Sequence, residues 1–404
     1  MMKFTYTARD QSGHTVKGNI EANDKKQAMD TIRAKNLMLL RLEVAKGGGL
    51  NLSFLSGKSR VTMDELVVFF RQLATMIDSG IPIVASLDIL KDQSENPTLK
   101  GVLTDVRDGV NTGASLSDAM MKHTNVFSSL FVNMVKAGES SGTLDAILDR
   151  IAAYIEKTSA LQAKIKSALV YPAVVSGMAV VITLVLIIKV IPVFKDIFSG
   201  FGAKLPTPTQ ILINISDFMR GYIWLMGIIV AAIVALAKWY YSTPKGKLTI
   251  DGLKLKAPVF GPLMNKVAIS KFTRTLSTLV KSGVPILAAL EIVAKTAGNT
   301  AVELAINNVR DSVRDGESIA APLERSGIFP SMVTRMVAVG EKSGQLEKML
   351  TKIADFYDAQ VDTAVDGLTS LIEPFIIAFL GIVIGTIVMC MFLPIFQITS
   401  VVNV

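Results

Sequence analysis

Three long apolar runs, each free of charged residues, stand out from the more polar remainder of the chain. The shortest, Gly221–Ala237, has 17 residues, and the other two reach 20. A helix rises about 1.5 Å per residue and needs about 20 residues to cross the hydrocarbon of a bilayer. The pattern therefore predicts three transmembrane helices, with three buried helices of a soluble core as the alternative. We assign the spans to residues 171–191, 221–240 and 373–394.

The charges beside these runs predict the topology. Residues 238–274 hold eight Lys or Arg against one acid, Asp251, whereas residues 192–219 carry no net charge. Loops retained in the cytoplasm are rich in Lys and Arg. We therefore expect a cytoplasmic N-terminus, a periplasmic loop at 192–220 and a periplasmic tail at 395–404. The expected points of membrane entry and exit are Pro172, Pro192, Glu373, Pro374 and Pro394.

The basic cluster has a second interpretation. Such a cluster can bind nucleic acid or anionic lipid headgroups. Its place directly after a membrane helix favours simple topology. We therefore expect the protein to contact membrane lipid and not nucleic acid.

The polar part of the chain is duplicated. Residues 69–90 match residues 272–293 at eleven of 22 positions, and GESSG at 138–142 matches GEKSG at 340–344. Order preserved over so many positions is the signature of an internal repeat. Apolar residues within each copy recur at helical spacing, so we predict two homologous cytoplasmic helical bundles, at 61–170 and 241–372. The second span then returns the second copy to the cytoplasm.

The N-terminal residues follow another pattern. Short alternating segments around one helical segment predict a small ββαβ cytoplasmic module at 1–45, and a glycine- and serine-rich linker follows at 46–60. The fold class is therefore mainly α: a polytopic membrane protein with two cytoplasmic bundles, three transmembrane helices and this module.

Composition limits the chemistry. One cysteine and two histidines leave no set of residues for a Cys or His metal cluster, and no nucleophile–base arrangement has enough candidates. Gly57-Lys58-Ser59 resembles the end of a phosphate-binding loop, but the motif needs glycine at position 52, which is leucine. We expect no enzyme activity, no cofactor and no metal.

The repeated GExSG motif supplies the candidate site residues. Glu139 and Glu341 are either a partner- or cation-binding surface or, as we favour, carboxylates that cap the start of a helix. Arg71 and Arg274 occupy equivalent positions in the two copies and are candidate partners for these carboxylates. The candidate structural or partner-binding residues are Arg71, Glu139, Gly142, Arg274, Glu341 and Gly344.

Together, the duplicated FxRxLxT…SG[IV]P and GExSGxL motifs resemble the type II secretion F-domain family of inner-membrane platform proteins. The segments KTSALQAKIKSALVYP at 157–172 and LPIFQ at 393–397 are similar to its type IV pilus branch. The resemblance implies a non-enzymatic platform in the bacterial inner membrane. It also implies partners: a hexameric pilus assembly ATPase, with a retraction ATPase as a further candidate, pilin subunits, other inner-membrane pilus components and further copies of the chain.

Three other functions remain as alternatives. The same platform role in type II secretion would act on a pseudopilus. A transporter or channel would need polar, ion-binding residues in mid-span, and the three apolar runs carry no charged residue there. A membrane-bound ATPase would need a nucleotide site, for which the failed phosphate-loop spacing gives no support.

Overall fold

The computed structural model describes residues 2–9, 15–22, 24–34, 38–44, 60–200, 206–258 and 260–402. The chain forms two compact units. The first contains residues 1–60 together with 96–98, and the second contains 61–95 and 99–404. Each is described by itself.

The first unit holds a small antiparallel sheet with one helix. Its elements are β1 (Met2–Arg9), β2 (Thr15–Ala22), α1 (Lys25–Ala34) and β3 (Met38–Val44). The strand order is β2-β1-β3. Tyr6 and Ala8, two residues apart on β1, face the same side and form a small core with Ile32 of α1. The predicted linker lies outside the described residues except for Arg60.

The first bundle starts the second unit. Aromatic residues fill its centre: Phe70 is fully buried and its ring lies 4.9 Å from Phe131 and 6.1 Å from Phe127, centroid to centroid. Apolar residues at helical spacing place these rings on inward faces. The helices are α2 (Met63–Asp78), α3 (Ile83–Gln93), α4 (Pro97–Asn111), α5 (Leu116–Met121), α6 (Ser129–Ser141) and α7 (Leu144–Val185).

The second bundle repeats this order, as the duplicated sequence predicts. Phe272 packs on Phe329 at 4.7 Å, and these residues correspond to Phe69 and Phe127 of the first copy. The helices are α11 (Gly261–Lys281), α12 (Ile286–Thr296), α13 (Thr300–Arg314), α14 (Ala320–Arg325), α15 (Ser331–Ser343) and α16 (Leu346–Val402). One further helix, α10 (Pro244–Lys256), precedes them.

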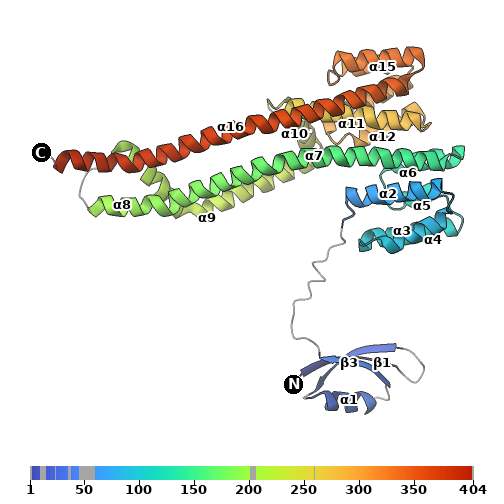
Figure 1. The fold of residues 1–404 in the computed structure, drawn as a ribbon, viewed down its shortest axis with the longest axis horizontal. Coiled ribbons are helices and arrows are strands. Elements are labelled where there is room, and N and C mark those ends of the chain that lie inside the picture. Colours follow the sequence, from blue (N-terminus) through green and yellow to red (C-terminus); the bar gives the residue numbers. More distant parts are fainter. Residues whose placement is uncertain are drawn as a thin grey trace. The chain divides into compact units, whose positions relative to one another are not determined.

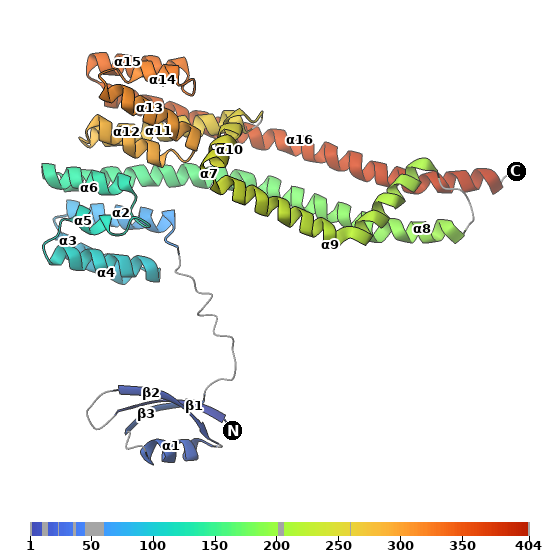
Figure 2. The ribbon, with the colours of Figure 1, turned by 180° about the vertical axis from the view of Figure 1, so that it is seen from behind.

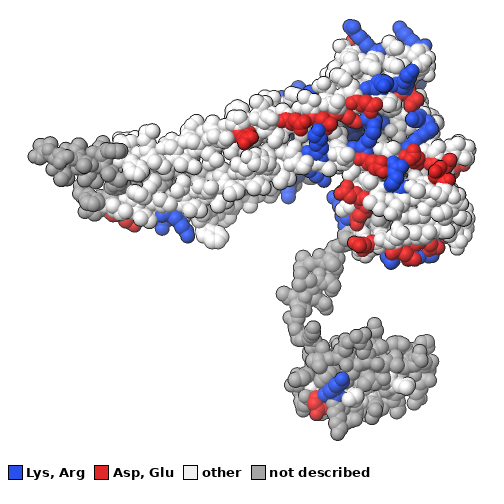
Figure 3. Space-filling view, viewed as in Figure 1, with Lys and Arg blue, Asp and Glu red and all other residues white. Residues whose placement is uncertain are grey.

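The last helix of each bundle continues into an apolar stem (Figure 1). Three helices are long and apolar enough to cross a membrane: 144–197, Thr207–Ser242 (α9) and 346–394. Most apolar side chains along them are exposed, among them Trp224 and Phe375. Charged side chains gather over the bundles and leave the stem almost bare (Figure 3). The chain is therefore a membrane protein, because water does not solvate so large an apolar surface.

The prolines at the expected membrane boundaries do not end helices. Pro172 lies inside α7, and Pro374 and Pro394 lie inside α16. A proline removes one backbone hydrogen bond, which neighbouring helices can make up for in a membrane helix. The predicted boundaries at 170/171 and 372/373 therefore fall within continuous helices. Exposed Glu373 also lies within α16.

Residues 192–220, which the sequence analysis assigns to a loop, are helical wherever they are described, apart from Pro206 at the start of α9. α7 passes through a π-helical turn, η2 (Leu186–Val190), into α8 (Ile191–Gly200), which contains Pro192, and α9 begins at Thr207. The chain bends within α9 at Tyr222, whose φ and ψ of −117° and 17° are not helical. The charged residues that marked this segment as a polar loop do not prevent a helix, because Lys and Asp are both tolerated in helices.

Candidate functional site: contacts that join the bundles to the membrane helices

The repeated glutamates cap helices. The Glu139 carboxylate accepts the backbone N–H groups of Leu116 (2.5 Å) and Ser117 (3.2 Å), at the start of α5. Glu341 accepts those of Ile319 (2.6 Å) and Ala320 (3.1 Å), at the start of α14. The first N–H groups of a helix have no hydrogen-bond acceptor within it and carry partial positive charge. A carboxylate therefore both accepts their hydrogen bonds and balances that charge. The favoured capping interpretation is confirmed.

The glycines of the same motif allow a close approach and a turn. A Cβ on Gly138 would lie 2.9 Å from Ile147 Cγ1, and one on Gly340 would lie 2.9 Å from Leu346 Cα. Gly142 and Gly344 end α6 and α15 with φ of 69° and 68°, a conformation that favours glycine. The motif therefore turns the chain tightly into the helix that leads to the membrane.

The repeated arginines bind a different set of acids. Arg71 on α2 forms a bidentate pair with Glu156 on α7, at 2.6 and 2.7 Å, and a third hydrogen bond to Asp149 at 2.7 Å. Arg274 on α11 pairs with Asp355 (2.9 Å) and with Asp358 on α16. The suggested pairing of these arginines with Glu139 and Glu341 is wrong, because those carboxylates face the starts of α5 and α14.

The two arginine clusters are equivalent and differ in burial. Glu156 and Asp358 are 202 residues apart, the offset of the GExSG motifs. The hydrogen bond from Arg71 lowers the pKa of Glu156. Burial alone would raise the pKa of Asp355, but its contact with Arg274 lowers it overall. The Arg71 side chain is 40% exposed and that of Arg274 only 13%, so solvent screens the second cluster less.

Contacts between α7 and the second bundle join the two copies. The buried Tyr154 hydroxyl lies 3.0 Å from Thr275 Oγ1. Lys164 pairs with Asp362 of α16 at 3.1 Å. On both sides of this ion pair the contact is apolar, where Leu161 and Ile165 pack against a cluster around the buried Leu263, Val361, Val365 and Leu368. The two helices that enter the membrane are thus packed side by side where they leave the bundles.

Buried Asp251 joins the second span to the second bundle, a role that our sequence analysis missed. Its carboxylate accepts the Tyr241 hydroxyl at the end of α9 (3.1 Å) and the Thr300 N–H at the start of α13 (3.0 Å). Lys254 Nζ donates at 2.8 Å. Burial alone would raise the pKa of Asp251, but these hydrogen bonds lower it to about 2. The signal in the sequence was its isolation, as the one acid among eight bases.

Polar contacts also join the spans. The Thr209 hydroxyl on α9 donates to the Cys390 carbonyl of α16 at 2.5 Å, and the Ser216 hydroxyl donates to the Ile187 carbonyl in η2 at 2.5 Å. Thr209 and Ser216 are seven residues apart, so they lie on one face of α9. All three membrane helices are therefore held together near their ends remote from the bundles.

Comparison with known proteins identifies the family. Residues 69–192 and 272–394 each match "Type II secretion system (T2SS), protein F", and residues 1–43 match the N-terminal domain of the same family. Each of the longer matches runs from the first helix of a bundle into its membrane helix. The chain belongs to the type II secretion system protein F family.

Several full-length relatives are similar to the chain. Type IV pilus assembly protein PilC of Myxococcus xanthus is 44% identical over 99% of this chain and 96% of its own length. The protein of the same name from Thermus thermophilus is 40% identical over both complete chains. Type II secretion system protein F of Vibrio cholerae is 32% identical, also over both complete chains.

Removing the charge of one capping glutamate should loosen the short helix that it caps. We expect Glu341→Gln to cost about 1–2 kcal/mol, because a charge-assisted pair of hydrogen bonds at a helix start is weakened. Hydrogen–deuterium exchange of residues 319–325 should accelerate. Glu324→Gln, at an exposed position on α14, is the control. Equal exchange in both variants would contradict the capping role.

The low pKa of Asp251 predicts a defined pH dependence. Because its folded value of about 2 lies below the ordinary 3.8, the carboxylate stabilises the fold above about pH 4. That contribution, about 2 kcal/mol, declines as the pH falls toward 2. The difference in unfolding temperature between the unmodified protein and Asp251→Asn should therefore shrink over this interval. Exposed Asp78→Asn is the control, and a pH-independent difference would refute the assignment.

Proposed function

We propose that this protein is the inner-membrane platform of a type IV pilus assembly machine. It receives work from a hexameric cytoplasmic ATPase and uses it to move pilin subunits from the bilayer into the filament. One observation carries this proposal: each bundle continues into a candidate membrane span through one helix, α7 or α16, without an intervening loop. Two of the relatives most similar over their full length are named as pilus assembly proteins.

The arrangement suits a transmission element. At about 1.5 Å per residue, the 42 residues of α7 extend about 63 Å, roughly twice the hydrocarbon thickness. A continuous helix resists bending because backbone hydrogen bonds join its successive turns, and Pro172 removes only one of those in α7. Arg71 and Arg274 join the first helix of each bundle to α7 and α16, respectively. Force applied to a bundle therefore reaches the lipid-embedded part through backbone rather than through a linker.

The orientation follows from charge. We propose that the N-terminus and both bundles lie in the cytoplasm and that the C-terminus is periplasmic. The basic residues that follow α9 favour retention of that segment in the cytoplasm. The role requires no catalytic group, cofactor or metal of its own. The exposed apolar faces of the stem are available for pilin, for other pilus components and for further copies of the chain. A retraction ATPase is a further candidate partner.

Deletion of the gene should abolish surface pili and twitching while secretion of folded enzymes continues. Complementation with the unmodified gene should restore pili. The expected result rests on the greater similarity to the pilus proteins, at 44% and 40% identity, than to the secretion protein at 32%. Loss of secreted enzymes with normal pili would instead assign the chain to type II secretion.

Weakening α7 between the first bundle and the expected membrane surface should uncouple motion of that bundle from motion of the membrane helices. We expect the double variant Lys166→Gly and Ser167→Gly to lose most pili, because each glycine costs about 1 kcal/mol more than alanine in a helix and adds freedom to bend. Both positions are exposed, so packing is unaffected. Crosslinking of the bundle at 61–170 to the assembly ATPase should persist. Lys166→Ala with Ser167→Ala is the matched control, and equal loss of pili in both would refute mechanical coupling through α7.

A further inference from the structure

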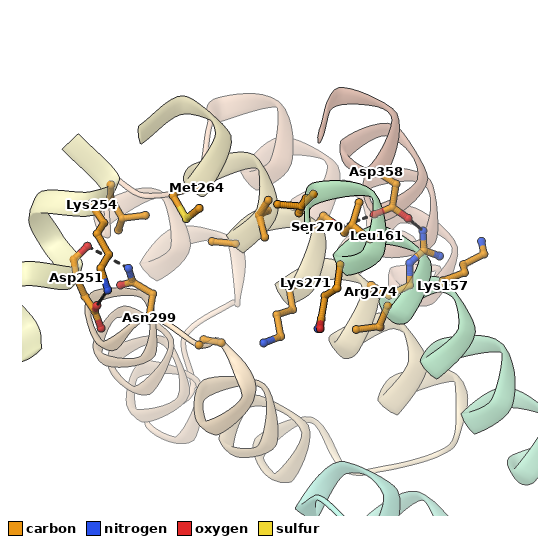
Figure 4. Close-up of a pocket in the computed structure, with 18 of the residues that line it drawn as sticks. Lys157, Leu161, Asp251, Lys254, Met264, Ser270, Lys271, Arg274, Asn299 and Asp358 are labelled. Atoms are coloured by element: carbon orange, nitrogen blue, oxygen red, sulfur yellow. Dashed lines mark hydrogen bonds and ion pairs between the residues drawn. The ribbon is translucent and has the colours of Figure 1, made fainter. Parts of the chain in front are cut away.

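A cavity of about 260 Å³ lies where α7 meets the second bundle (Figure 4). Its walls come from α7, α10, α11 and α16 and from the turn between α12 and α13. Figure 2 shows α10 leading from α9 toward these helices. Pockets for drug-sized ligands measure about 300–1,000 Å³, so this cavity suits a smaller group.

Lys271 on α11 points into this cavity without a charged partner (Figure 4). Among the described residues, no ion pair or hydrogen bond engages its ammonium group. Burial lowers the pKa of Lys271. A Cβ on Gly298 would lie 3.2 Å from Nζ, so the glycine leaves room for the ammonium beside the backbone. An unpaired ammonium in such a place is costly unless an anion accompanies it.

The other charges of the wall are already paired. Lys254 donates to Asp251 at 2.8 Å, and Arg274 pairs with Asp358. Lys157 lies 3.5 Å from Asp355, which is outside the wall. The lining therefore holds four bases against two acids, a formal excess of two positive charges. Only the charge of Lys271 lacks a protein counter-ion among the described residues, and it lies between the two paired clusters.

The cavity lies close to the expected membrane surface. Ile165 of its wall precedes Pro172, the expected membrane entry of α7, by seven residues, or about 10 Å of helix. On the other side its wall includes Leu255 of α10, the helix that follows the second span. Apolar side chains such as Leu161 and Val267 share the wall with the bases. Basic pockets beside membrane helices are places where lipid headgroups bind.

The first bundle has no lysine at the position equivalent to Lys271. At the offset of 203, Lys271 corresponds to Val68, which is 54% exposed. The hollow beside Val68 is lined by Asp64, Glu65 and Glu95, and no Lys or Arg is among the described residues that line it. Packing of the shared fold does not require a lysine at this position. The lysine is therefore a property of the second copy alone.

We propose that this cavity binds a phosphate-bearing anion, with the Lys271 ammonium as its principal charged contact. Two sources share that chemistry: the headgroup of an anionic phospholipid and a soluble phosphate compound. The ligand would supply the counter-charge that the protein does not, and it would join α7, α11 and the helix that follows the second span. The inference depends on the cavity and not on the proposed assembly role.

The test uses the full-length protein in nanodiscs and measures the rate at which an amine-reactive reagent labels Lys271, by mass spectrometry. Discs of phosphatidylcholine alone are compared with discs that also contain phosphatidylglycerol, and inorganic phosphate is titrated into the first kind. Bound anion should slow labelling of Lys271 about tenfold, while exposed Lys295, which pairs with Glu291, should be unaffected.

Variants test the residue itself. Lys271→Gln and Lys271→Val should bind the protecting anion, phosphatidylglycerol or inorganic phosphate, about tenfold more weakly in native mass spectrometry, as expected for one lost charge-assisted contact. Lys295→Gln is the control. Lys271→Val introduces valine, the residue that the first copy has at the equivalent position, Val68. Protection by phosphatidylglycerol alone would identify a lipid headgroup, and protection by phosphate would identify a soluble ligand. Protection by neither, or unchanged binding in both Lys271 variants, would overturn the proposal.

Discussion

The structure depends on the continuity of α7 and α16, which run from the bundles into the apolar stem without an intervening loop. Lipid offers no partner for a free N–H or C=O, so a chain that enters it must already be helical. Here the helix forms well before the expected membrane surface, as the final helix of each bundle. The packing of a water-soluble bundle and the geometry of a membrane helix are consequently properties of the same element.

Duplication supplies the contacts that hold these helices. In each bundle an arginine of the first helix forms ion pairs with carboxylates of the last helix. A glutamate of the GExSG motif caps the short fourth helix. The copies have nevertheless diverged. The Arg71 cluster lies open to solvent, whereas the Arg274 cluster is enclosed by α7 and lies beside a cavity. The second bundle is also joined to α9 through Asp251.

The sequence predicts the large features of this fold for physical reasons. Apolar runs of about 20 residues have few roles outside a membrane, and repeated motifs require repeated structure. Helix ends are harder to predict from the sequence. Pro172 and Pro374 would be ordinary stop signals in soluble helices, yet they lie inside long continuous helices here. The pairing of Arg71 with Glu156 joins residues 85 positions apart, and no local pattern specifies such a contact. The capping role of the glutamates was predictable in kind, but the helix that is capped was not, because Glu139 accepts N–H groups 22 and 23 positions earlier in the chain.

The asymmetry between the copies bears on how work would pass through the molecule. A bundle fixed to two membrane helices cannot turn without moving both, and the second bundle is joined to α16 through Arg274 and to α9 through Asp251. The first bundle is joined to α7 through Arg71. Because α7 also packs on α16 through Leu161 and Ile165, motion of the first bundle must be shared with the second where the stem begins. That contact lies where both bundles lead into the apolar stem, and the cavity beside Lys271 lies against it, because Leu161 and Ile165 also line the cavity.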